Sequence, residues 1–109
     1  MTKESNSFKG IIASIRRRPG MYSATGDLEH IRSFLNGYFL GLAECDSADE
    51  DFVLFHEKFH EFVDKKFSNN NTMVSWPKII SAYCSNDQKL DSVQEFCSIV
   101  DEFLYSYKK

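Results

Sequence analysis

Four phenylalanines recur at spacings of three, four and three residues in the middle of the chain. They are Phe52, Phe55, Phe59 and Phe62, and Val63 follows the last of them. Side chains three and four residues apart share one face of an α-helix, whereas a strand would place every second residue on one face. The spacing therefore predicts a helix with an aromatic stripe, and we expect this stripe to be buried against the second and last helices of a bundle.

Two further helices are predicted before this stripe. The first has its N-cap among Ser5, Asn6 and Ser7, and its apolar face consists of Phe8, Ile11, Ile12 and Ile15. The second follows Asp27, a favourable N-cap residue, and its apolar face consists of Leu28, Ile31, Phe34, Leu35, Tyr38, Phe39 and Leu42. Gly37 and Gly41 interrupt the second helix, and we expect them to permit close approach of a neighbouring helix.

Pro19 and Gly20 separate these two helices. Proline disfavours the helical conformation of the residue before it, so the first helix is expected to end near Arg17. Met21 and Tyr22 are then expected to fold back onto the helices on either side. The arginines at 16–18 lie at a helix C-terminus, where positive charge is favourable, and a phosphate or partner contact is the alternative interpretation.

Two more helices are predicted after the aromatic stripe. A short one is expected to have Pro77 at its first position, followed by Ile79, Ile80 and Tyr83. The apolar face of the last helix consists of Leu90, Val93, Phe96, Cys97, Val100, Phe103, Leu104 and Tyr107. The chain shows no alternating strand pattern, so we expect residues 1–109 to form a single all-α domain, a bundle of about five helices.

Composition restricts the classes of function. The net charge of −3 and the pI of about 5.5 disfavour a nucleic-acid partner and allow a basic protein partner. Cys45, Cys84 and Cys97 are widely spaced and odd in number, which fits a reducing cytoplasm better than a disulfide framework or a thiolate zinc site. No apolar run reaches the roughly 20 residues of a membrane span, and the N-terminus lacks an apolar signal core.

One short motif suggests an enzyme. His56, Glu57 and His60 match the HExxH pattern, in which two histidines one helical turn apart bind zinc and the glutamate activates water. The metzincin extension requires glycine and histidine where this chain has Val63 and Lys66. We therefore expect boundary histidines beside a phenylalanine core, with no metal and no cofactor, and a small zinc-dependent hydrolase is the alternative.

The segment at 16–22 looks like the RKRPGMYIG segment of gyrase and topoisomerase ATPase domains. That likeness is local. Those domains use a helix with a glutamate and an asparagine to bind magnesium, and glycine-rich lids to bind ATP, and this chain lacks both. ATP binding is not expected.

A second resemblance extends over nearly the whole chain. Five segments follow one another in the chain, namely IRRRPGMY, LEHIRSFLNGY, the phenylalanine helix, SWPKII and FCSIVDEFL. In this order they resemble small all-helical bacterial immunity proteins of contact-dependent growth inhibition and polymorphic toxin systems. The chain departs from that group at residues 21–24 and at Pro77. The resemblance implies a non-enzymatic cytoplasmic protein that covers the active site of a cognate toxin domain, such as an RNase, and it leaves the oligomeric state open.

Acidic residues are the candidate contacts to such a toxin, because nuclease clefts are basic. The first candidates form an acidic segment, residues 44–51, and are Glu44, Asp46, Asp49, Glu50 and Asp51. The second candidates, in the last helix, are Asp101 and Glu102. Ser47 and Glu50 also form a capping-box pattern that predicts the start of the aromatic helix. We expect reversal of charge at Asp49 and Asp51 to leave the fold intact.

Overall fold

Five α-helices account for most of the structure. A computed structural model describes residues 7–23, 27–67, 74–85 and 91–107. The helices are α1 (Phe8–Arg17), α2 (Leu28–Glu44), α3 (Glu50–Lys66), α4 (Trp76–Ser85) and α5 (Ser92–Tyr107), and a 3₁₀ turn, η2 (Pro19–Met21), follows α1. No strand occurs within those ranges, and the predicted all-α bundle of about five helices is confirmed.

Short polar side chains begin three of the helices by binding free backbone N–H groups. Ser7 Oγ accepts from Gly10 N at 3.0 Å, so Ser7 is the N-cap of α1, while Ser5 and Asn6 lie outside the described residues. Asp27 caps α2 as predicted, accepting from Glu29 N at 2.9 Å. Asp91 accepts from Val93 N at 2.9 Å at the start of α5, a cap that the sequence analysis missed, and Leu90 lies outside the described residues.

The turn after α1 buries only one of the two side chains predicted to fold back. The Tyr22 ring packs on Phe34, with 4.8 Å between the centroids, whereas Met21 is 71% exposed. The prediction for Met21 was wrong. Residues 19–21 form a 3₁₀ turn with three residues per turn, so consecutive side chains point about 120° apart, and Met21 faces outward when Tyr22 faces α2.

The aromatic stripe of α3 lies at the centre of the bundle. Phe52 contacts α2 through Phe39, with 5.5 Å between the ring centroids. Phe59 is 1% exposed and has three edge-to-face contacts, at 5.2 Å to Trp76, 5.8 Å to Phe96 and 5.4 Å to Phe103. The predicted burial against the second and last helices is therefore confirmed, except that Phe62 is only partly buried.

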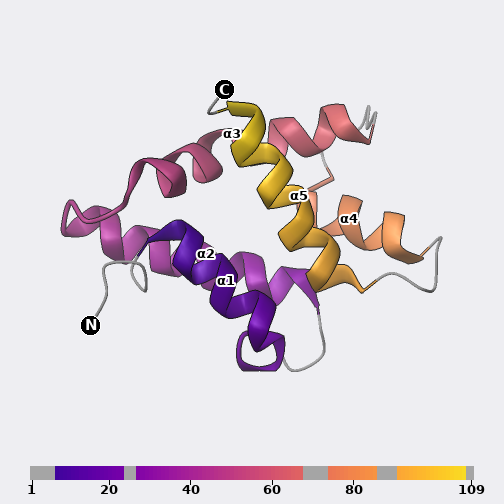
Figure 1. The fold of residues 1–109 in the computed structure, drawn as a ribbon, viewed down its shortest axis with the longest axis horizontal. Coiled ribbons are helices and arrows are strands. Elements are labelled where there is room, and N and C mark those ends of the chain that lie inside the picture. The colour runs from indigo at the N-terminus through magenta and orange to yellow at the C-terminus, as the bar shows by residue number, and fades with distance from the viewer. Residues whose placement is uncertain (1–6, 24–26, 68–73, 86–90, 108–109) are drawn as a thin grey trace.

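Helices α1 and α4 also cover the stripe. Phe8 of α1 lies 5.0 Å from Phe52 and 4.8 Å from Phe55 between ring centroids. Trp76, the first residue of α4, stacks on Phe96 of α5 at 4.9 Å. Pro77 takes the second position of α4, where a backbone N–H has no intrahelical acceptor and proline is tolerated. In Figure 1, α5 crosses in front of the bundle and α4 lies at the opposite end from the α2–α3 connection.

The glycines of α2 do not serve the predicted purpose. A Cβ atom added at Gly37 or Gly41 would have no heavy atom within 4 Å, and both positions are exposed. The expectation that a neighbouring helix approaches them was wrong, because α2 turns its opposite face, with Leu28, Ile31 and Leu35, towards the core.

Replacing Phe59 with alanine should lower the free energy of unfolding by about 3–5 kcal/mol, because its ring contacts residues of both α4 and α5. Phe62→Ala is the matched control and should cost less, since that ring is only partly buried. Urea denaturation followed by circular dichroism measures both changes. Equal losses for the two variants would contradict the central place of Phe59.

Candidate functional site

The α2–α3 connection begins with a backbone motif that ends α2. Asp46 N donates to Ala43 O at 3.1 Å, and Ser47 N donates to Leu42 O at 2.7 Å. These two bonds form a Schellman motif, whose left-handed residue is usually glycine. Here Asp46 takes that position with φ of 54°. An aspartate tolerates the left-handed conformation better than most residues, but less well than glycine.

Glu44 is also unfavourably placed for helix stability. It is the last residue of α2, where the partial negative charge of the helix end repels a carboxylate, and the last turn of α2 holds no basic residue. Two acidic residues, on either side of Cys45, thus occupy positions where other residue types would stabilise the fold better. Local choices that lower stability are typical of sites retained for function.

Two members of the acidic segment take part in the packing of the bundle and are not free surface residues. The Asp49 carboxylate accepts from Phe8 N, at 3.2 Å to Oδ1 and 3.3 Å to Oδ2, and so binds the N-terminal end of α1. Asp51 is only 7% exposed. Charge reversal at these positions would remove the contact to α1 and bury a lysine, so the structure argues against the expectation that the fold would remain intact.

The predicted capping box is absent. The N-cap of α3 is Asp49, and its side chain makes no capping hydrogen bond to α3. Ser47 Oγ donates instead to Cys45 O at 3.2 Å, inside the connection. The pattern failed because Ser47 takes part in ending α2, which moves the start of α3 two residues along the chain.

The other three acidic residues, Glu44, Asp46 and Glu50, form an exposed group that we term the acidic turn. None of the three forms an ion pair with another described residue. Leu40 lies one helical turn before Glu44 and is 61% exposed. Figure 1 shows the α2–α3 connection at the left end of the long axis of the molecule, where another protein can approach it.

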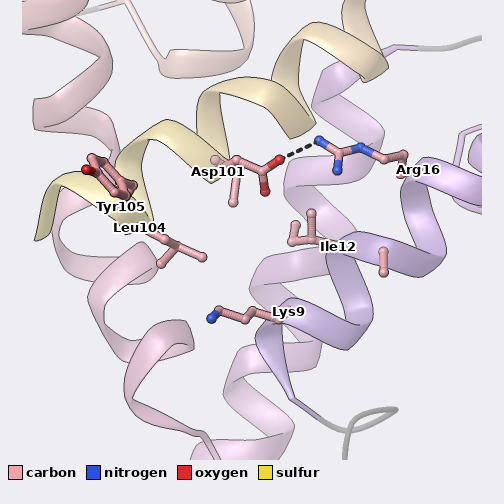
Figure 2. Close-up of a pocket in the computed structure, with 8 residues that line it drawn as sticks. Lys9, Ile12, Arg16, Asp101, Leu104 and Tyr105 are labelled. Atoms are coloured by element: carbon pink, nitrogen blue, oxygen red, sulfur yellow. Dashed lines mark hydrogen bonds and ion pairs between the residues drawn. The ribbon is translucent and has the colours of Figure 1, made fainter. Parts of the chain in front are cut away.

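Asp101 and Glu102 are engaged within the protein. Asp101 accepts from Arg16 Nη2 at 2.9 Å, across a groove of about 460 Å³ between α1 and α5 whose floor includes Ile12 and Leu104 (Figure 2). Glu102 lies 2.8 Å from Lys66 Nζ of α3. The hydrogen bond to Asp101 raises the pKa of the Arg16 guanidinium. Both carboxylates are therefore less available to a basic partner than those of the acidic turn.

The thiol nearest this ion pair is not suited to nucleophilic chemistry. Cys97 has no exposed surface, and burial raises the pKa of its thiol to about 11, although the Arg16 charge acts in the opposite direction. The thiol is therefore protonated at neutral pH, and a protonated thiol is a poor nucleophile.

The two histidines of the HExxH pattern line one cavity, and each contacts a different neighbouring side chain. His56 stacks on Phe39 with 4.2 Å between ring centroids, and His60 Nε2 lies 3.3 Å from Asp64 Oδ2. Among the described residues, no group of three or more His, Cys, Asp or Glu side chains is arranged to hold a metal ion.

No family model, curated protein or solved structure matches the chain. None of the helices in the described ranges has the length and apolar character needed to cross a membrane.

Asp49→Ala should destabilise the protein by about 1–2 kcal/mol, because the first backbone N–H of α1 loses its acceptor. Glu50→Ala, at the next position, removes a similar charge from an exposed side chain and should change the free energy of unfolding by no more than about 0.5 kcal/mol. Thermal melts of the two variants test this difference, and an unaffected Asp49→Ala variant would argue against the contact with α1.

Asp46→Gly should stabilise the protein by roughly 0.5–1 kcal/mol. Glycine relieves the left-handed backbone and removes a carboxylate from the C-terminal end of α2, which together outweigh its greater freedom in the unfolded chain. Asp46→Ala also removes the charge but does not relieve the left-handed backbone. Its free energy of unfolding should therefore be lower than that of the glycine variant. The midpoint of urea unfolding distinguishes them, and a less stable glycine variant would refute the argument.

Proposed function

We propose that this protein is an immunity protein, which binds a cognate toxin domain and covers its active site without performing a reaction. The observation that supports the proposal is the acidic turn, whose three exposed carboxylates have no ion-pair partner among the described residues. Glu44 and Asp46 occupy positions where a carboxylate lowers the stability of the fold. Binding to a partner gives a reason for their presence there. The ordered resemblance to helical immunity proteins supports the same role.

Charge and shape suggest a basic toxin, with a nuclease such as an RNase as the first choice. A nuclease cleft carries cationic side chains for phosphate, and carboxylates opposite them increase the association rate and favour one orientation. Leu40, on the same side of α2 as Glu44, supplies an exposed apolar contact beside the charges. Interfaces usually combine such an apolar contact with a polar rim.

The other candidate acids fit this role less well. Asp101 and Glu102 would have to leave Arg16 and Lys66 before binding a toxin. Asp49 and Asp51 belong to the interior contacts of the bundle. The zinc-hydrolase alternative has no supporting observation beyond the sequence motif, because the described residues offer no third ligand to His56 and His60.

Replacing Glu44 and Glu50 with lysine should reduce the association rate with the cognate toxin domain by about tenfold or more at low ionic strength, with a smaller effect at high salt. Stopped-flow or surface plasmon resonance measurements at two salt concentrations give the rate. If a large secreted protein with a variable C-terminal domain is encoded beside this gene, that domain is the toxin to test.

The matched control is a double replacement of Glu57 and Glu61 with lysine. Both residues are exposed on α3, away from the connection, and the change in net charge is the same. If both double variants slow association equally, only the total charge matters. If the Glu44 and Glu50 variant folds and binds as tightly as the parent protein, the acidic turn is not the interface.

A further inference from the structure

A second surface differs from the acidic turn because hydrogen-bond donors line it. A cavity of about 360 Å³ lies between the first half of α2, the middle of α3 and the start of α4. The side chains that line it are Arg32, Asn36, Phe55, His56, His60, Ser75 and Trp76. Most of these residues carry N–H or O–H groups, so the cavity differs from the largely apolar groove between α1 and α5.

Helical geometry brings the polar groups together. Arg32 and Asn36 lie one turn apart on α2, and His56 and His60 lie one turn apart on α3, so each pair shares a face of its helix. Trp76 opens α4, whose N-terminal end carries a partial positive charge. Three helices thus present positive or hydrogen-donating groups to one space.

Arg32 has one buried N–H group without a hydrogen bond to the described residues, and its side chain as a whole is 41% exposed. Its Nε atom is buried and makes no hydrogen bond to any described residue, although Glu29 Oε1 lies 3.3 Å away at ion-pair distance. A guanidinium has five N–H donors in a rigid fork and can bind an oxyanion through two of them at once. Glu29 lies beside Nε, and the two Nη groups have no partner among the described residues.

The two histidines have fixed positions at the wall of the cavity. The ring of His56 lies nearly parallel to Phe39, with an angle of 14° between the planes, and His60 is held by Asp64. The carboxylates beside these groups are Glu29, near Arg32, and Asp64, near His60. Asn36, Ser75 and Trp76 add neutral donors without adding negative charge.

These observations favour an anion over a metal ion. A guanidinium in the same cavity repels a divalent cation, and its N–H groups, like the indole N–H, cannot coordinate one. Phosphate oxygens, by contrast, accept from all of these groups, and charge-assisted hydrogen bonds to Arg are strong. We propose that the cavity binds a small oxyanion, the phosphate group of free phosphate or of a phosphate monoester, with Arg32 as the main ligand.

The chain contains three histidines, and the third provides an internal control. His30 is exposed on α2 and does not line the cavity. Titration of the protein with inorganic phosphate, at constant pH and ionic strength, should shift the ring NMR signals of His56 and His60 along a saturating curve and leave those of His30 in place. Equal shifts of all three rings, or no saturable shift, would overturn the proposal.

Two variants test the assignment to Arg32. Arg32→Gln should weaken phosphate binding by about tenfold or more, whereas Lys58→Gln, which removes an equal charge from an exposed position outside the cavity, should leave it unchanged. If Arg32→Gln fails to fold, Asn36→Asp can replace it, because Asn36 is exposed. The added carboxylate should weaken phosphate binding to a similar extent. If a folded Arg32→Gln or Asn36→Asp variant binds phosphate as tightly as the parent protein, the proposed site is wrong.

Two further titrations identify the ligand class. Adenosine monophosphate that binds more tightly than inorganic phosphate would indicate a phosphate monoester, and equal affinity would indicate free phosphate. Zinc chloride serves as the competing probe. If the His56 and His60 signals respond to stoichiometric zinc and not to either phosphate compound, the cavity is a metal site and the anion proposal fails.

Discussion

The burial of Phe59 against three aromatic rings is the contact on which the arrangement of the helices depends. Trp76 belongs to α4, and Phe96 and Phe103 belong to α5, so one side chain of α3 fixes the positions of two other helices. Edge-to-face contacts require particular ring orientations, which restricts how the helices can slide past one another. The cavity at the start of α4 depends on the same contacts, because Trp76 also lines that cavity.

Polar contacts distant in sequence attach α1 to this centre. Asp49 binds its first backbone N–H, and Gln94 Nε2 donates to Arg16 O at its other end, at 3.2 Å. The Arg16–Asp101 ion pair lies beside the second contact (Figure 2). The charged residues therefore divide into those that hold helices together and those, such as Glu44, that contribute nothing evident to stability. This division is the physical basis for proposing the acidic turn as a toxin-binding surface.

The α2 and α3 helices contribute residues to two separate surfaces. Their shared connection presents the carboxylates of the acidic turn, whereas Arg32, His56 and His60 line the cavity near the start of α4. A basic toxin at the connection and a small anion in the cavity would bind different surfaces, so the two proposals are independent. In the anion proposal, the helical spacing of the HExxH pattern places its two histidines in one cavity with Arg32.

The sequence alone determined the fold class and the central aromatic stripe. Helical spacing, the Ser7 and Asp27 caps and the break after Arg17 follow from interactions within a few residues, and such interactions are readable from the order of residues. Only the tertiary structure decided which acids remain exposed. Asp49 meets a helix end 41 residues away, and Arg16 and Asp101 are separated by 85 residues. No local pattern marks either pair, because each exists only once the buried rings have brought distant helices together.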